Sequence, residues 1–169
     1  MERPIERAAS FSRDRRYRYD LRRRWDEGPA LTWVMLNPSM ADERRDDPTI
    51  RRCIAFSRAW GFGALRVVNL FALRTPTPCA LLEAADVLGP GGERALRSAL
   101  RSADAVVVAW GNVHPRLSGR AEEVRRLLPA EAMCLGVTGR GEPRHPLYVA
   151  GGTEPATLSV FGAAPTMAA

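Results

Sequence analysis

Three polar side chains lie at or inside apolar segments, where an ordinary turn residue or a hydrophobe would be expected. Asn37 follows the apolar run at 30–36, Asn69 interrupts the run at 64–73, and His145 lies within Arg-His-Pro-Leu-Tyr. A buried amide must find partners for its two N–H donors and its oxygen, or it costs free energy. Taken alone, Asn37 could cap a turn and His145 could be a satisfied structural histidine. Their occurrence at successive predicted strand ends instead indicates a ligand site.

The elements that would position these side chains alternate between strands and helices. Apolar and alternating runs predict strands at 17–25, 30–36, 64–73, 105–111 and 132–139. We expect the first two strands to form a hairpin. Helices are predicted between Asp47, a suitable N-cap, and Gly61, and over 93–104 and 119–129.

This alternation predicts a three-layer α/β sandwich with a central, mostly parallel four-stranded sheet plus an N-terminal antiparallel hairpin strand. Residues 15–150 would form one domain, after a flexible N-terminal arm at 1–14 and before a loosely ordered C-terminal tail at 151–169. Parallel sheets place their sites beyond the carboxyl ends of the strands. We therefore expect Asn37, Asn69, Trp110-Gly111-Asn112 and the segment 138–149 to meet on one rim.

Composition favours an ordinary globular protein. The chain has 169 residues, of which 46% are hydrophobic and 26% are charged. No apolar run approaches the length needed to cross a bilayer, and the N-terminus lacks the apolar core of a signal peptide. We expect a cytoplasmic monomer with no membrane partner.

The charge leaves two interpretations open. The formal net charge is +6, and all 25 basic residues are arginine. A polyanionic partner such as DNA would account for this excess, and so would GC-rich coding. Three separated cysteines and two histidines form no metal-binding spacing, so we expect neither a metal nor another cofactor.

A dense string of acids and arginines follows Asn37. Its acids could pair with neighbouring arginines, cap the next helix, or bind a hydroxyl or an amine of a base or nucleoside. We interpret this string as the wall of a ligand pocket, in which Asp47 also caps the helix. The residues assigned to the wall are Pro38, Ser39, Asp42, Asp46 and Asp47.

Five ordered motifs carry a resemblance to a known family. They are Asn-Pro-Ser-x-Ala-Asp-Glu, Asp-Asp-Pro-Thr-Ile-Arg-Arg, Val-Asn-Leu-Phe-Ala, Ala-Trp-Gly and Gly-Glu-Pro-Arg-His-Pro-Leu-Tyr. Together they resemble a family of bacterial and phage proteins of unknown function, over about residues 15–150. That resemblance implies no established reaction.

A more distant resemblance has chemical content. A strand ending in Asn-Pro, a strand with a central Asn, a strand ending in Trp-Gly and a final His-Pro are together similar to the uracil-DNA glycosylase superfamily. The resemblance implies that Asn37 positions an attacking water, Asn69 reads the Watson–Crick edge of a base, and His145 steadies the departing base anion. It therefore implies a hydrolase that cleaves an N-glycosidic bond without a metal, with DNA as partner and DNA repair as the process.

The same resemblance implies a surface that turns a base out of a duplex. Leu147 or Tyr148 would fill the gap in the stack, and Arg140 and Arg144 would contact phosphates. The ring on which the base stacks would be Phe71, Phe56 or Trp60, unless these rings simply fill the core.

Two departures from the superfamily pattern keep other functions open. Met35 stands where Gly is usual, and Leu147 replaces the Ser of His-Pro-Ser. These departures favour a non-catalytic protein that binds nucleic acid or a modified base. The acids after Asn37 favour a third possibility, an enzyme acting on a free nucleoside or nucleotide.

Overall fold

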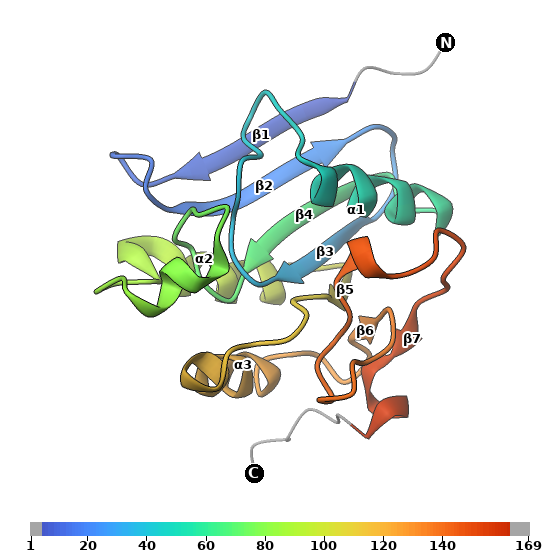
Figure 1. Ribbon diagram of the computed structural model, residues 1–169. Helices are drawn as coiled ribbons and strands as arrows, with labels where there is room; N and C mark the ends of the chain where they lie inside the picture. The colour runs from blue at the N-terminus through green and yellow to red at the C-terminus, as the bar shows by residue number, and fades with distance from the viewer. Residues whose placement is uncertain (1–4, 163–169) are drawn as a thin grey trace.

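One mixed sheet of seven strands organises the computed structural model, which describes residues 5–162 (Figure 1). The strands are β1 (Glu6–Phe11), β2 (Arg18–Arg24), β3 (Ala30–Met35), β4 (Ala64–Asn69), β5 (Ala105–Val108), β6 (Met133–Cys134) and β7 (Ala156–Thr157). Their order across the sheet is β1-β2-β4-β3-β5-β6-β7. Neighbours from β4 to β6 run parallel, whereas β1, β2 and β7 pair antiparallel. The predicted α/β class is confirmed, but the sheet is wider than predicted.

The predicted hairpin between 17–25 and 30–36 is wrong. β4 lies between β2 and β3, so these two consecutive strands are not neighbours. The connection between them wraps around the start of β4 instead of turning tightly. The N–H groups of Trp25 and Asp26 both donate to the Gly63 carbonyl, and the Gly63 N–H donates to the Pro29 carbonyl. These bonds take the place of a hairpin ladder.

Both chain ends add edge strands that the sequence prediction leaves out. β1 lies within the predicted flexible arm and pairs with β2 along its length. β7 lies within the predicted tail, and Leu158 after it is 1% exposed in the core. The rest of the predicted arm and tail, residues 1–4 and 163–169, lies outside the described residues.

Three α-helices cover the two faces of the sheet in the described part of the chain: α1 (Pro48–Ala59), α2 (Gly89–Arg101) and α3 (Ser118–Arg125). α1 starts as predicted, because Asp47 Oδ1 accepts from the Ile50 N–H at 2.9 Å. One core cluster joins α1 to Trp33, and another joins α2 and α3 to Val34 and Val108 on the opposite face. These two cores define three layers (Figure 1).

The parallel strands end earlier than their apolar runs. β4 ends at Asn69 rather than residue 73, and β5 ends at Val108 rather than residue 111. Glycines in the left-handed region turn the chain beyond the sheet, at Gly111 (φ +74°) and Gly136 (φ +95°). The polar residues that follow the strands therefore lie in loops at the carboxyl edge. None of the helices within residues 5–162 combines the length and the apolar character that a membrane span needs.

Candidate functional site

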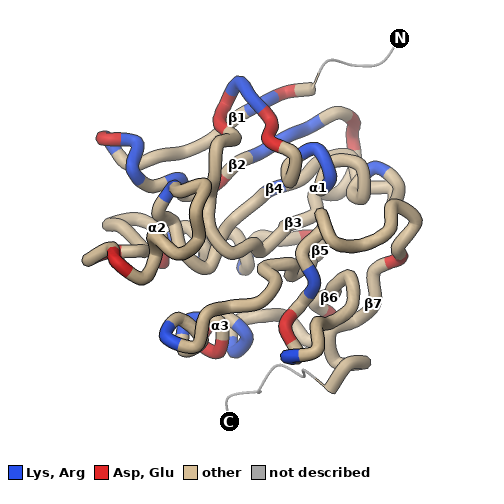
Figure 2. Tube along the Cα trace, in the orientation of Figure 1, with Lys and Arg blue, Asp and Glu red and all other residues tan. Residues whose placement is uncertain are grey.

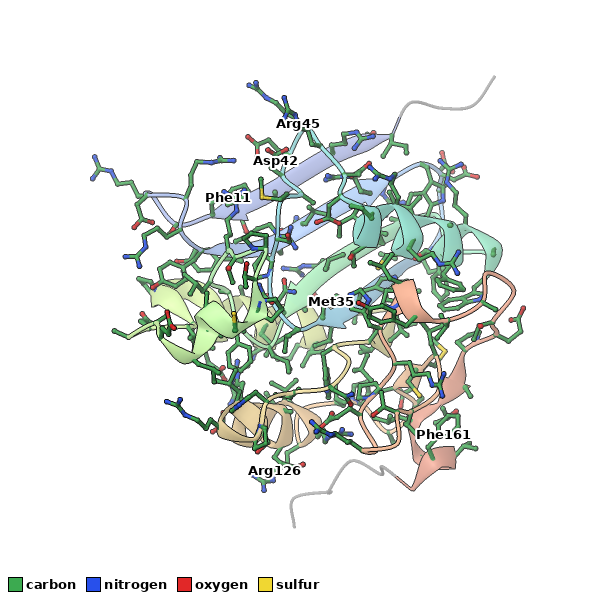
Figure 3. All side chains as sticks on the ribbon, viewed as in Figure 1. Phe11, Met35, Asp42, Arg45, Arg126 and Phe161 are labelled. Atoms are coloured by element: carbon green, nitrogen blue, oxygen red, sulfur yellow. The ribbon has the colours of Figure 1, made fainter. Side chains whose placement is uncertain are left out.

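A cavity of about 300 Å³ lies at the carboxyl edge of β3 and β4, beside the start of α1. The 3₁₀ helix Pro146–Tyr148 borders it on another side. Met35, labelled in Figure 3 at the end of β3, is part of its lining. The structure brings several predicted residues together here, from every segment expected to meet on one rim. They are Asn37, Ser39, Asn69, Trp110, His145 and Tyr148.

The Asn37 amide is held by two loops. Its Nδ2 donates to the carbonyl of Pro38 at 3.0 Å and to that of Thr75 at 2.9 Å. Because both partners are carbonyls, the NH₂ end must face them and the orientation of the amide is fixed. No donor among residues 5–162 bonds to Oδ1. Asn37 therefore offers the cavity a hydrogen-bond acceptor.

The Asn69 amide is buried without a partner. Asn69 is the last residue of β4 and is 9% exposed. Its side chain lines the cavity and makes no hydrogen bond to any residue that the structure describes. Its amide atoms are not among the fully inaccessible unpartnered atoms, so they face the cavity, where a ligand with a matching edge can bond to them.

His145 is set up as a neutral donor. It caps the 3₁₀ helix, and its Nδ1 accepts from the Leu147 N–H at 3.2 Å. An accepting Nδ1 carries no proton, so the proton of the neutral ring is on Nε2. Burial lowers the pKa of His145 below its ordinary value, against the opposing effect of the Asp47 carboxylate. At neutral pH the ring is uncharged and can donate through Nε2–H.

The Ala-Trp-Gly motif holds the segment that leads to His145. Trp110 Nε1 donates to Glu142 at 2.7 Å, and Arg125 pairs with the same carboxylate at 2.7 Å. The Gly111 N–H donates to the Pro143 carbonyl at 2.8 Å. A Cβ at Gly111 would lie 3.5 Å from His145 Cβ, so the segment just after β5 passes close to the histidine.

Asp47 lines the cavity, but its carboxylate oxygens serve the backbone. Oδ1 accepts from Ile50 N–H, and Oδ2 accepts from Ala41 N–H at 3.3 Å. Its negative charge still acts on His145 and on Arg18. Asp47 is therefore mainly a helix cap whose charge lies beside the site.

The acidic pocket wall predicted from Asp42 and Asp46 is corrected, because neither residue lines the cavity. Asp46 bridges Arg7 at 2.6 Å and Arg23 at 2.8 Å. Asp42 accepts from two backbone N–H groups of its own loop, which lowers its pKa. Figures 2 and 3 show both charge signs on this loop, with Asp42 and Arg45 well away from Met35. Asp46 thus fastens the loop to β1 and β2, and Asp42 orders the loop itself.

Pro38, also predicted for the wall, lies outside the cavity lining. Its carbonyl accepts from Asn37 Nδ2 and from the Thr75 N–H.

The rings predicted to stack on a base are core residues. Phe71 is 2% exposed in the cluster under α2 and α3. Phe56 packs against Trp60 at 5.2 Å between ring centroids, and both belong to the core on the α1 face. The aromatic rings that line the cavity are instead Trp110, which is 1% exposed, and Tyr148, which is 80% exposed and 5.6 Å from the His145 ring.

The predicted wedge and phosphate residues surround His145 on the surface. Leu147 is 44% exposed beside Tyr148. Arg140 and Arg144 are exposed on the loop before His145. Arg144 Nε donates to the Val137 carbonyl at 3.0 Å, and Arg144 borders a separate hollow that Tyr148 shares. None of these residues except Tyr148 lines the cavity itself.

Sequence reasoning missed Arg18, which also lines the cavity. The residue is 3% exposed, and its guanidinium donates through Nη1 to the Ala41 carbonyl at 2.9 Å, while Nε is buried without a partner. Burial lowers its pKa to about 10, against the opposing effect of Asp47, so it is charged at neutral pH. In the sequence it is one of several arginines in an alternating strand, and no spacing distinguishes it.

Fold and site together define a three-layer α/β protein with a polar cavity at the carboxyl edge of its parallel strands. The chain belongs to the family described as "Protein of unknown function (DUF1643)", whose profile matches residues 18–147. The matched range contains Arg18, Asn37, Asn69 and His145. No curated protein and no solved structure matches the chain significantly. Within the described residues, no three His, Cys, Asp or Glu side chains are grouped to hold a metal.

Proposed function

We propose that this protein is a glycosylase-like hydrolase that accepts an altered base from DNA and cleaves its N-glycosidic bond with water. One observation carries the proposal: Asn37, Asn69 and His145, far apart in the chain, line one cavity, and each has hydrogen-bonding capacity left over. A partly open cavity of this kind, with a few polar groups among apolar ones, suits a small planar ligand with its own donors and acceptors.

His145 would act on the leaving group. Breaking the C–N bond leaves its electron pair on the base, so negative charge develops on a ring oxygen as the bond lengthens. A donor that is already oriented stabilises this charge more in the transition state than in the ground state. The fixed Nδ1 contact to Leu147 N–H makes Nε2–H that donor. A neutral imidazole can do this without losing its proton.

Asn37 would hold the nucleophile. Its free Oδ1 can accept from a water, while its NH₂ group is committed to two carbonyls. The water oxygen attacks the anomeric carbon of the oxocarbenium-like sugar and loses a proton to solvent or to the departing base. Asn37 aligns the water rather than deprotonating it, because an amide is not a base at neutral pH.

Asn69 would read the base. A side-chain amide offers one acceptor and two donors in one plane, which matches the adjacent carbonyl and N–H of a uracil-like edge. Its burial in the cavity means that a mismatched edge would leave Asn69 unsatisfied. That penalty gives the site its selectivity.

The exposed residues around His145 support a nucleic acid as the binding partner. Tyr148 and Leu147 are exposed apolar side chains directly beyond His145, suited to fill the space that a displaced base leaves. Arg140 and Arg144 are exposed on the preceding loop. The net charge of +6 favours a phosphate backbone as partner.

Met35 favours a second candidate function, a reader that binds the base without turnover. It is 4% exposed and lines the cavity, where the glycosylase superfamily usually has glycine. A bulky side chain there would narrow the space for water and sugar. The free-nucleoside enzyme is less well supported, because Asp42 and Asp46 lie outside the cavity lining.

Base release from DNA tests the proposal. Single- and double-stranded oligonucleotides carrying uracil, hypoxanthine or modified pyrimidines would be incubated with the full-length protein at high concentration. We expect release from at least one substrate and a loss on the order of 10²-fold in Asn37→Ala. Asn112→Ala is the matched control, because Asn112 bonds to Thr138 at 2.7 Å on the exposed surface.

The alternatives give different results in the same assays. No release from any substrate, with salt-dependent binding that Asn37→Ala leaves unchanged, would support the reader. Thermal stabilisation by nucleosides but not by DNA would support an enzyme for free nucleosides.

A further inference from the structure

Two buried arginines in β2 differ sharply in their partners. Arg23 is 0% exposed and pairs with Asp46 at 2.8 Å, and it also donates to the carbonyl of Arg22 at 2.8 Å. Arg18 is 3% exposed, forms no ion pair with any described residue, and donates only to the Ala41 carbonyl. Arg23 is thus a satisfied structural cation, whereas most of the donors of Arg18 remain unused.

Arg18 is directed at the cavity of the candidate site rather than at solvent. It lines this cavity together with Asn69, whose side chain makes no hydrogen bond to any described residue. Thr49 and Ile50, in the first turn of α1, line the same space, and a helix N-terminus favours negative charge. Asp47 is the one carboxylate in the lining, and backbone N–H groups occupy its oxygens.

An isolated buried guanidinium is unfavourable unless something else offsets its lost hydration. A planar oxyanion suits it best, because the guanidinium fork can donate two parallel hydrogen bonds to carboxylate or phosphate oxygens. Since Arg18 is almost fully buried, it would meet the end of the ligand that enters deepest, rather than a phosphate of a strand passing over the rim.

We propose that the ligand of this cavity carries an oxyanion at its buried end, and that Arg18 binds that oxyanion while Asn69 bonds beside it. The inference deepens the proposed function and rests on it for the assumption that the rest of the ligand is base-like. The oxyanion is either a carboxylate on a pyrimidine ring or the phosphate of a nucleotide.

Calorimetric titration of the full-length protein would separate these sources. The probes are uracil against uracil-5-carboxylate, uridine against uridine 5′-monophosphate, and inorganic phosphate alone. We expect one charged probe to bind on the order of 10-fold or more tightly than its uncharged counterpart. Hydrogen bonds between the Arg18 guanidinium and the oxyanion would contribute free energy of this size, because both groups are charged. A preference for the carboxylate would identify an altered base, and a preference for phosphate would identify a nucleotide.

Variants at Arg18 decide whether this residue is responsible. Arg18→Met should abolish the preference, and Arg18→Lys should keep part of it, since a lysine retains the charge but not the fork. Arg44→Met is the matched control: Arg44 is exposed on the loop before α1, and its loss removes the same charge. If Arg18→Met does not fold, the oxyanion preference of Arg18→Lys is compared with that of the parent instead.

Three results would overturn the inference: no oxyanion probe binds at low millimolar concentration, charged and uncharged probes bind equally, or Arg18→Met keeps the preference. A merely structural role would lower the unfolding temperature of Arg18→Met and leave the preference intact. Base release from DNA is measured separately, so an oxyanion preference without release would contradict only the glycosylase proposal. Release without the preference would contradict only the role of Arg18.

Discussion

Two His-Pro turns adopt the same local structure and lie in different surroundings. His114 and His145 each precede a three-residue 3₁₀ helix, Pro115–Leu117 and Pro146–Tyr148. In both turns the histidine Nδ1 accepts from the N–H two residues later, at 3.2 Å. The local sequence therefore fixes the tautomer in the same way twice.

The two histidines differ in how the rest of the protein packs around them. His114 is exposed and lies outside the lining of the site cavity. His145 is half-buried, and α1 holds its turn: Arg52 donates to the carbonyl of Pro146 at 3.2 Å and to that of Val149 at 2.6 Å. A His-Pro turn thus supplies an oriented donor, and only its environment can make that donor functional.

The largest expected difference between the two turns is in catalysis. If the proposed function holds, His145→Ala should lower the rate of base release on the order of 10²-fold, because the proposed donor to the leaving group is lost. His114→Ala should leave the rate within about twofold, since it loses only the same kind of local cap. Single-turnover assays on the best DNA substrate would measure both. Equal losses would mean that the turn acts through stability alone.

Glycine substitutions test whether the turn at Gly111 helps to hold His145 in place. Gly111→Ala should lower the free energy of unfolding by about 1–2 kcal/mol, because an L side chain is strained at φ +74°, whereas the new Cβ would make only an ordinary contact with His145 at 3.5 Å. Gly119→Ala, in α3 beside the His114 turn, meets no atom within 4 Å and should be neutral or slightly stabilising. Urea denaturation would compare them. A neutral Gly111→Ala would argue against this support.

Arg52 tests the link between the His145 turn and α1. Arg52→Met should lower the free energy of unfolding by about 1 kcal/mol through two lost backbone contacts. It should also speed hydrogen exchange at Leu147 N–H. Ser118→Ala is the counterpart at the other turn, where Ser118 Oγ donates to the Pro115 carbonyl at 2.7 Å. If exchange at Leu147 is unchanged, α1 does not hold the turn.

The smallest effect is expected from pH. Burial lowers the folded pKa of His145 below the ordinary 6.5, so the unfolded chain binds a proton first as pH falls. The contribution to stability is present above pH 6.5 and is lost as pH falls through the lowered folded pKa. His145→Ala should show a weaker decline in unfolding temperature between pH 7 and about pH 5 than the parent. Identical profiles for His145→Ala and the parent would contradict the assignment to His145.

Local patterns were enough to predict much of the fold. The cap at Asp47 and the apolar runs of β3, β4 and β5 depend on neighbouring residues, so they could be identified in the sequence. Pairing between strands distant in sequence could not be predicted, because nothing near residues 17–36 indicates that β4 lies between β2 and β3. β1 was missed for the same reason, since its Ala-rich strand is recognisable only beside β2.

The candidate site was only partly predictable. Asn69 could be selected because an amide within an apolar strand needs an explanation, and His145 was selected through a resemblance rather than its own spacing. The environments of Arg18, in β2, and Phe71, in the loop after β4, depend on tertiary packing, which buries one at the cavity and the other in the core. Asp46 likewise finds Arg23 only through the folded sheet.

The clamp on Asn37 has a consequence for the reaction. An aspartate at this position would bring a carboxylate against the carbonyl oxygens of Pro38 and Thr75, which repel it. These contacts therefore favour the neutral amide over a strong proton acceptor at this point. The proposed hydrolysis would then depend on how readily the base departs, so electron-poor bases would be cleaved fastest and ordinary bases in the genome would be spared.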